Sequence, residues 1–426
     1  MAQNENDVIL SVQHLCQYFK IGRRRELKAV DDVSFDIHRG EVFGLVGESG
    51  CGKTTTGRTI IKLYNATSGD VYFKGQRIGA GIRSYQDAIR NARKETKEAI
   101  DKLNAETKED PTKKDENDAK IKELQDKLNE VVSKNREEIK KANFDHKNCD
   151  KEFSKRMIAE IEEKYKPLFE EAGDDKEKLA EVTKKYKQEL VVAKKSKLVT
   201  QIQMIFQDPI ASLNPRMTVQ EIISEGLIIK GIRDKEYIQE QVYNILETVG
   251  LVKEHATRYP HEFSGGQRQR IGIARSVIMN PDIIIADEPV SALDVSIQAQ
   301  VVNLLNDLRH QMGLTVLFIA HDLSVVKYFS DRIGVMYYGN MVELASSDEL
   351  FAHPVHPYTR SLLSAIPLPD PDYEKTRVRI TYNPIAEHDY TVNKPTFREI
   401  VPNHFVMCND EEEKRYLKEF FGIDKE

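Results

Sequence analysis

The chain has 426 residues, of which 40% are hydrophobic and 31% are charged, and its formal net charge is -6 at pH 7. This length can bury the core of two or three domains, and the negative charge argues against nucleic-acid binding driven by a broad basic field. The longest apolar runs are too short to span a bilayer and the four cysteines are scattered, so we expect a protein of the reducing cytoplasm with no membrane anchor of its own.

The first motif is GESGCGKT at 47–54, between a strand-like run, VFGLV, and a helix-like run, TTTGRTIIKLY. It matches the G-x-x-x-x-G-K-[ST] pattern, whose glycines let backbone N–H groups surround phosphates at a helix N-terminus. Lys53 is expected to reach the β- and γ-phosphates and Thr54 to bind Mg²⁺. The predicted nucleotide-binding residues of this loop are Gly47, Glu48, Ser49, Gly50, Cys51, Gly52, Lys53, Thr54 and Thr55.

The next region differs sharply in composition. Residues 81–200 hold 30 Lys and Arg, 28 Asp and Glu, and only two glycines, which is typical of exposed helix. Apolar residues at helical spacing and the breaks EDPTKKDEN and EEAGDDKEK predict two to four charged helices, as a short coiled-coil hairpin or partly disordered. We predict an insertion at 81–198 that is either a solvated decoration or a docking arm.

Flanking this insertion, strand-like runs alternate with helical segments, which predicts a largely parallel α/β sheet. The strand IIIAD ends in Asp287, with Glu288 directly after it. An acidic residue at the carboxyl end of such a strand faces the nucleotide crevice. Asp287 is therefore expected to hold Mg²⁺, chiefly through water, and Glu288 to orient or deprotonate the attacking water.

A second loop suited to anions precedes another predicted helix, at Ser264, Gly265, Gly266 and Gln267. One chain cannot easily fold both loops onto one γ-phosphate, whereas two chains packed head to tail can. We therefore expect ATP to join two such chains and hydrolysis to release them.

Six ordered motifs, GESGCGKT, FQDP, FSGGQ, IIIADEP, SALD and IAHD, resemble those of ATP-binding cassette (ABC) ATPases over residues 8–350, apart from the insertion. The resemblance implies a P-loop NTPase fold: a RecA-like core with an antiparallel β subdomain and a helical signature subdomain. It also implies that Gln207 contacts Mg²⁺ and the attacking water, that His321 contacts the γ-phosphate, and that Asp294 lies at the dimer interface. Phe19 or Tyr18 would stack on adenine, with Phe19 favoured.

Longer stretches, including HPVHPYTRSLLSAIPLPDP in a C-terminal extension at 351–426, resemble the F-type ATPase subunit of oligopeptide permeases. The resemblance implies an ATPase at the cytoplasmic face of the membrane, working with a second ATPase subunit, two permease subunits contacted through 210–262, and an extracytoplasmic peptide-binding protein. Dipeptide, nickel and glutathione remain alternative cargoes. In this family many members carry several cysteines in this tail, which the resemblance would assign to an iron–sulfur cluster. Only Cys408 is present here, so we expect no cluster held by cysteines.

Two other classes of ABC ATPase fit the sequence less well. A chromosome-maintenance ATPase also carries coiled coils inside an ABC cassette, but here the insertion precedes Gln207, its heptads are short, and the HPYTRSLL tail has no place in that class. A ribosome-associated ABC factor usually needs two cassettes in one chain, and one is visible.

Overall fold

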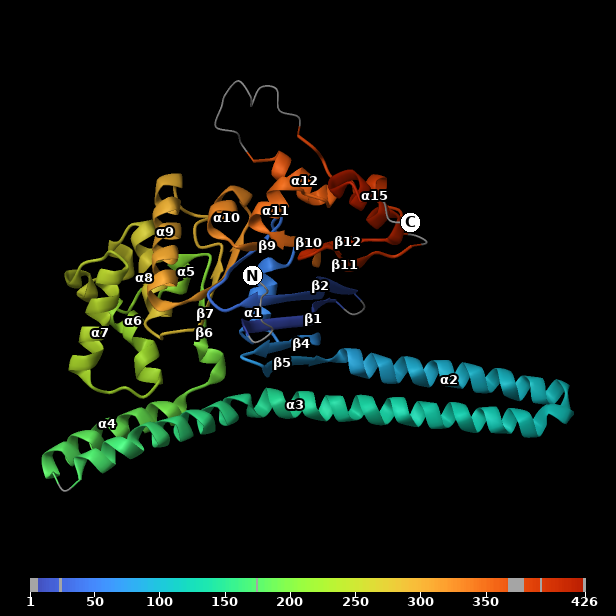
Figure 1. Cartoon of the computed structure of the whole chain (residues 1–426), viewed down its shortest axis with the longest axis horizontal. Coiled ribbons are helices and arrows are strands. Elements are labelled where there is room, and N and C mark those ends of the chain that lie inside the picture. Colours follow the sequence, from blue (N-terminus) through green and yellow to red (C-terminus); the bar gives the residue numbers. More distant parts are fainter. Residues whose placement is uncertain (1–6, 23–24, 174, 367–378, 391–392, 424–426) are drawn as a thin grey trace.

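The computed structural model describes residues 7–22, 25–173, 175–366, 379–390 and 393–423 (Figure 1). The first sheet is antiparallel, with strand order β2-β1-β4-β5. Its strands are β1 (Val8–Ile21), β2 (Arg25–His38), β4 (Ser68–Phe73) and β5 (Gln76–Ile82). Phe35 of β2 stacks on Phe43 of the second sheet at a ring-centroid distance of 4.9 Å, so the two sheets share one apolar layer.

The second sheet has eight strands in the order β11-β12-β10-β9-β3-β8-β7-β6. Its strands are β3 (Val42–Val46), β6 (Ile202–Ile205), β7 (Ile283–Asp287), β8 (Thr315–Ala320), β9 (Arg332–Tyr337), β10 (Asn340–Ser346), β11 (Thr396–Val401) and β12 (His404–Cys408). The neighbours β9, β3, β8, β7 and β6 all pair in parallel. The predicted parallel α/β sheet is thereby confirmed.

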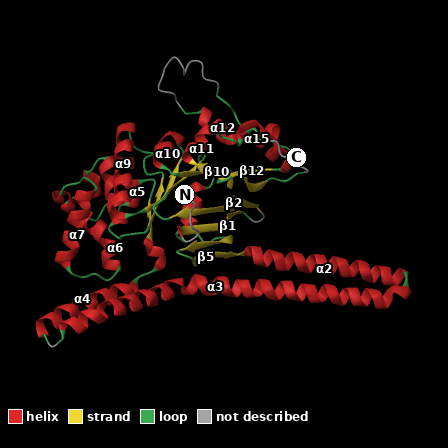
Figure 2. Ribbon diagram, in the orientation of Figure 1, coloured by secondary structure: helices red, strands yellow, loops and turns green. Residues whose placement is uncertain are grey.

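The antiparallel sheet lies on one side of this sheet, and most of the helices lie on the other (Figure 2). The helices outside the charged insertion are α1 (Lys53–Ile60), α5 (Pro209–Ser212), α6 (Val219–Ile229), α7 (Lys235–Thr248), α8 (Gly265–Val277), α9 (Val295–Met312), α10 (Leu323–Phe329), α11 (Ser347–Ala352), α12 (Pro357–Ser364), α14 (Pro384–Glu387) and α15 (Asp410–Phe421). Every residue of β3, β7 and β8 is buried, because helices or the first sheet cover both faces.

Alternate residues along the central strands belong to two different hydrophobic core clusters. Val42 and Val46 of β3 pack into the cluster shared with α6–α10, while Phe43 and Leu45 pack into the cluster shared with the antiparallel sheet. Successive strand side chains point to opposite faces, so a one-residue shift in register would exchange the two cores.

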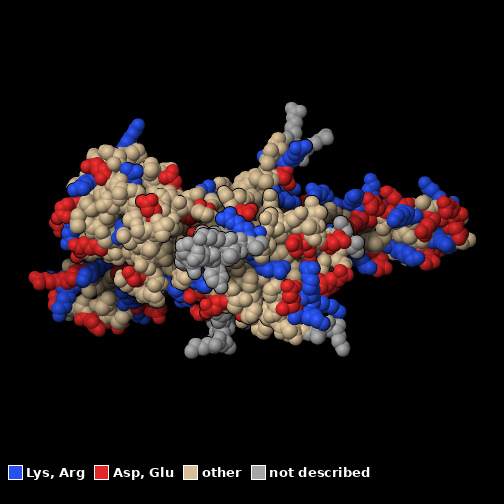
Figure 3. All heavy atoms as spheres, turned by 90° about the horizontal axis from the view of Figure 1, so that it is seen from above, with Lys and Arg blue, Asp and Glu red and all other residues tan. Residues whose placement is uncertain are grey.

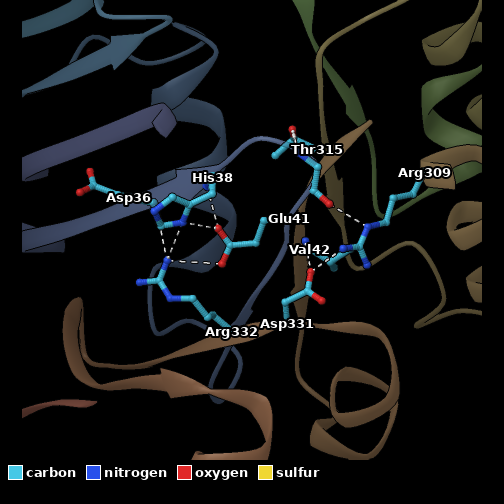
Figure 4. A network of polar contacts seen from close by, with 9 residues as sticks. Asp36, His38, Glu41, Val42, Arg309, Thr315, Asp331 and Arg332 are labelled. Atoms are coloured by element: carbon cyan, nitrogen blue, oxygen red, sulfur yellow. Dashed lines mark hydrogen bonds and ion pairs between the residues drawn. The ribbon is translucent and has the colours of Figure 1, made fainter. Parts of the chain in front are cut away.

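Polar contacts join the amino ends of the parallel strands (Figure 4). Asp331 accepts from the Val42 N–H at 2.8 Å and from Arg309 at 2.7 Å. Arg332 donates to Glu41 at 3.3 Å. Because Val42 opens β3 and Arg332 opens β9, this network fixes the end of the sheet opposite the predicted nucleotide crevice.

The charged insertion forms three helices, α2 (Arg83–Glu109), α3 (Lys114–Ala172) and α4 (Lys176–Lys195), as antiparallel pairs in a long arm (Figure 1). At 1.5 Å per residue, the 59 residues of α3 span about 90 Å. The predicted helices and both predicted breaks are confirmed, but the predicted hairpin is not short, since α3 alone has 59 residues. Ile161 and Tyr165 of α3 are buried against Ala193 of α4, whereas Leu168, at the same helical spacing, is 37% exposed.

The C-terminal extension joins the main sheet. β12 pairs with β10 through Glu343↔Val406 and Leu344↔Phe405, and β11 pairs with β12 at the sheet edge. The domain boundaries stay a prediction, but the two parts share a sheet. Among the described residues, no helix is both long enough and apolar enough to cross a bilayer.

Candidate functional site

The glycine-rich loop lies between β3 and α1, where only glycine fits at two positions. Gly47 has φ 148° and Gly52 has φ 108°, a range that side chains disfavour. A Cβ on Gly47 would lie 2.2 Å from the Met336 carbonyl oxygen, and one on Gly52 would lie 2.2 Å from that of Ala29. The backbone of the loop is therefore pressed against its neighbours into a fixed cradle.

The lysine of the motif points back into this cradle. Lys53 is 3% exposed, and its Nζ donates to the carbonyl oxygens of Gly47 at 2.8 Å and Glu48 at 2.9 Å. Glu48, Ser49 and Gly50 are exposed, while Thr54 and Thr55 are half-buried at the start of α1. The arrangement places an ammonium group and a helix N-terminus at one anion site.

Thr54 and Asp287 form a pair of oxygen groups beside the loop. The Thr54 hydroxyl donates to Asp287 Oδ1 at 2.7 Å. Asp287 is fully buried at the end of β7, and burial raises the pKa of its carboxyl group, an effect opposed by the Thr54 bond. Within the described part of the chain, Asp287 Oδ2 has no hydrogen-bond partner. The Arg58 guanidinium lies 3.9 Å from this oxygen. A buried carboxylate oxygen that accepts no hydrogen bond, next to a hydroxyl, fits a hard divalent cation such as Mg²⁺.

Glu288, Gln207 and His321 meet at a cavity of about 480 Å³. Gln207 Nε2 donates to Glu288 Oε2 at 2.9 Å, and His321 Nδ1 lies 3.4 Å from the same oxygen. Glu288 has a left-handed backbone, φ 45°, an uncommon conformation that concentrates at functional sites. The cavity is lined by Ser49, Gln207, Asp208, Glu288, Ser291, Ala292 and His321.

The second predicted anion loop lies elsewhere on the chain. Ser264 caps α8, and a reciprocal capping box joins it to Gln267. A Cβ on Gly265 would lie 3.5 Å from Leu293, whereas one on Gly266 would lie 2.7 Å from Ile297. None of the four loop residues lines the cavity beside Glu288. The structure therefore does not bring the two loops together within one chain.

Asp294 is the N-cap of α9, and its side chain makes no capping bond. It is exposed, and the neighbouring Val295 is 82% exposed. Both residues are therefore accessible to a second chain.

The two candidate adenine-stacking residues differ in how much of their surface is engaged. The Tyr18 hydroxyl donates to Asp31, and Lys28 Nζ and the Arg83 guanidinium lie 5.2 and 5.5 Å from its ring centroid. Phe19 is half-buried and meets Tyr64 edge-on at 5.3 Å. One face of Phe19 is the more available for stacking.

Sequence reasoning missed three residues of this region. Asp208 and Ser291 line the cavity, and the Glu48 N–H donates to the hydroxyl of Tyr358 at 2.9 Å. Asp208 follows Gln207 directly and stands before Pro209, which is a helix-start signal. The contact of Tyr358 has no local signal, because 310 positions separate it from Glu48.

Comparison with known proteins gives two family matches. The ABC transporter model matches residues 30–158 and 164–291, and the model for the C-terminal region of oligopeptide/dipeptide transporters matches residues 342–393. Among solved structures, a dimeric ATP-binding cassette in a post-hydrolysis state with ADP and phosphate aligns at 21% identity and TM-score 0.48, covering 80% of this chain and 99% of that one.

Several curated proteins align over nearly their whole length. The oligopeptide transport ATP-binding protein OppF of Bacillus subtilis (strain 168) is 46% identical over 409 residues, which cover 96% of this chain and 98% of that protein. AmiF of Streptococcus pneumoniae serotype 4, also an oligopeptide transport ATP-binding protein, is 41% identical, with 92% and 93% covered. The dipeptide transport ATP-binding protein DppF of Lactococcus lactis subsp. cremoris is 39% identical, with 96% and 97% covered. The chain is therefore an ATPase of the ATP-binding cassette (ABC) transporter family.

Proposed function

We propose that the chain is the subunit that energises import of oligopeptides through a membrane transporter by hydrolysing ATP. The relatives named for oligopeptide transport and the match at 342–393 support this cargo class. Dipeptides are the second candidate cargo, since one relative is named for dipeptide transport.

The catalytic part of this proposal rests on the position of Glu288. Its side chain contacts Gln207 and His321, and it follows directly after Asp287, which binds Thr54. In this proposal the loop 47–55 and Lys53 bind the phosphates of ATP, and Phe19 stacks on adenine. Thr54, Asp287 and Gln207 would hold Mg²⁺, which when bound neutralises charge on the phosphates. Glu288 accepts the proton of the attacking water, Gln207 keeps its carboxylate in place, and His321 contacts the γ-phosphate.

The second half of each ATP site would come from a second ATPase subunit. At the start of α8, away from this chain's own cavity, Gly265 and Gly266 present backbone N–H donors, while Ser264 and Gln267 use theirs in the capping box. Asp294 would lie at the same interface. A head-to-tail pair places this loop on the partner's nucleotide, so that ATP joins the two subunits.

Two permease subunits and an extracytoplasmic peptide-binding protein would complete the assembly, with this chain at the cytoplasmic face of the membrane. The segment 210–262 is the proposed permease contact. It exposes large apolar side chains, including Ile210 at 64% and Ile229 at 66%. Gln207 and Asp208 line the cavity two to three positions before Ile210, so the contact surface begins directly after residues of the site.

The test is co-purification from native membranes of the Glu288→Gln chain with ATP, which should bind ATP without turnover and lock the closed assembly. We expect a second ATPase, two multi-span permeases and a peptide-binding protein, while Lys53→Ala, which removes the phosphate contact, should recover far less of the ATPase partner. Recovery of DNA or chromosome-associated chains with no membrane proteins would refute the importer. Unchanged turnover of the assembled Glu288→Gln complex would refute the assigned base.

A further inference from the structure

The C-terminal extension reaches the phosphate-binding loop through one side chain. The Glu48 N–H, in the second residue of the loop, donates to the Tyr358 hydroxyl at 2.9 Å. Tyr358 lies in α12, is 2% exposed, and packs against Tyr337 and Tyr382 at ring-centroid distances of 4.4 and 5.6 Å. Burial raises the pKa of the Tyr358 hydroxyl, so the group is neutral at physiological pH and accepts this bond.

A buried carboxylate fixes the turn that carries Tyr358. Glu343 of β10 accepts from the N–H groups of Val355 at 2.8 Å and His356 at 3.0 Å. It also accepts from His404 Nε2 of β12 at 2.9 Å, and both side chains are fully buried. Charge-assisted bonds of this kind are shorter and stronger than neutral ones. The turn before α12 is therefore tied to two strands of the main sheet.

The loop is held at a second point by the turn between β9 and β10. The Gly339 N–H donates to the Cys51 carbonyl oxygen at 2.9 Å, and Met336 closes the space beside Gly47. β10 thus contributes to both contacts: its leading turn binds Cys51, and its Glu343 holds the segment that binds Glu48. The loop lies between two groups whose positions depend on the same strand.

We propose that Tyr358 is a positioning residue for the phosphate-binding loop, which makes the C-terminal extension part of the ATP site. This inference rests on the proposed role of loop 47–55 in binding ATP. Without the hydroxyl, the Glu48 N–H loses a buried acceptor and the loop samples more conformations, which ATP must then restrict on binding. Pre-organisation of this kind changes nucleotide affinity more than the rate of the chemical step.

The test compares Tyr358→Phe with Tyr382→Phe in the full chain. Both variants keep an aromatic ring in the same cluster, but the hydroxyl of Tyr358 alone bonds to the loop among the described residues. For Tyr358→Phe we expect the Kd for a fluorescent ATP analogue with Mg²⁺ to rise about three- to tenfold, the range set by one lost hydrogen bond. In the assembled complex KM should rise in parallel with kcat near that of the wild type, and hydrogen exchange of the peptide 47–54 should accelerate. Tyr382→Phe should leave all of these unchanged.

Equal Kd and equal exchange for Tyr358→Phe and the wild type would overturn the inference. The same rise for Tyr382→Phe would also overturn it, because general loosening of the aromatic cluster would then be the cause. A wild-type chain that fails to bind the ATP analogue would refute the proposed function of the loop itself, so the two failures are distinguishable.

Discussion

At the scale of single residues, the pairing of Thr54 with Asp287 offers a direct test of the proposed Mg²⁺ site. Thr54→Val keeps the side-chain volume and removes the hydroxyl that binds Asp287 Oδ1 at 2.7 Å. We expect ATP affinity measured with Mg²⁺ to fall at least tenfold, toward the value measured in EDTA, because one of the oxygen ligands is lost. The affinity measured in EDTA should change little. Isothermal titration calorimetry with and without Mg²⁺ measures both.

The matched control is Thr59→Val in the same helix, because the Thr59 hydroxyl donates to the Thr55 carbonyl oxygen within α1. It should retain the full response to Mg²⁺. A Thr54→Val chain that gains as much affinity from Mg²⁺ as the wild type would contradict the assignment of Thr54 as a ligand.

The burial of His356 leads to a prediction of how the free energy of unfolding depends on pH. Burial, with smaller effects of His388 and Arg360, lowers the pKa of His356 from 6.5 to about 3. The unfolded chain therefore binds this proton at higher pH than the folded chain does. The contribution to stability is complete above about pH 6.5 and is lost as pH falls toward 3, by up to about 1.4 kcal/mol per pH unit.

The measurement is the free energy of unfolding between about pH 7 and about pH 5, compared with that of His356→Asn. His356 is the N-cap of α12, and its Nδ1 accepts from the Tyr358 N–H at 3.1 Å. Asparagine can also cap a helix but does not titrate. We expect the wild type to lose about 2 kcal/mol more than the variant over this interval. Parallel pH profiles would show that His356 does not stay neutral in the folded chain.

The site residues that could be predicted from the sequence are those that stand in a recognisable local sequence pattern. Lys53, Thr54, Asp287 and Glu288 stand at strand ends or in a glycine-rich loop, where spacing alone implies their place in a crevice. Tyr358 stands in a Pro-rich segment with no period and meets Glu48 only because β10 and β12 fix the turn before α12. Such a contact depends on tertiary structure and leaves no trace in nearby residues.

At the scale of elements, the arm separates into an outer part and an anchored base. α2 has no buried residue, and between 114 and 141 α3 buries only Asn117. Lysine, arginine and acidic side chains alternate over the protruding end (Figure 3). At the base, Arg77 of β5 pairs with Asp145 of α3 at 2.6 Å and with Asp70 at 3.3 Å. The charge pattern predicted exposed helices, but their length and anchoring depend on these contacts with the sheet.

We predict that replacing residues 92–130 with a short Gly-Ser turn leaves the free energy of unfolding and ATP turnover unchanged, because almost nothing buried is removed. Arg77→Met, by contrast, should lower stability by about 2–3 kcal/mol, since it leaves two carboxylates without their partner. Chemical denaturation and phosphate release test both. Loss of peptide uptake by the trimmed chain with intact ATP turnover would instead identify the outer arm as a docking element.

At the scale of the whole molecule, the loop 47–55 follows β3, Asp287 ends β7 and His321 follows β8, so these candidate site residues lie at the carboxyl ends of parallel strands. The helix α8 lies beside the sheet (Figure 1). The alternation of strand-like runs and helical segments along the chain predicted this sheet. It could not predict that β11 and β12 extend the sheet beyond β10, because short edge strands carry a weak alternation and pair with a strand far away in sequence.

The separation of α8 from the cavity leads to a prediction about assembly. A Cβ on Gly265 would make only ordinary contact with Leu293 at 3.5 Å, and an acidic residue in the first turn of a helix is favourable for folding. Gly265→Asp should therefore leave the fold intact and place a negative charge where the proposed arrangement puts the partner subunit's γ-phosphate. Coulomb repulsion between the added carboxylate and the γ-phosphate beside it would be strong enough to prevent ATP binding at the partner's site.

Vanadate trapping of a photoactivatable ATP analogue reads the two sites separately when a tag on this chain lets the two ATPase chains be resolved by size. Gly265→Asp in this chain should remove the label trapped on the partner and spare the label on this chain. Gly265→Asn, which adds nearly the same volume at the same place without the charge, should spare both. If Gly265→Asp removes the label from its own chain only, the second loop serves its own nucleotide and the head-to-tail arrangement is wrong, because only an exchange of loops between subunits can separate the substituted chain from the impaired site.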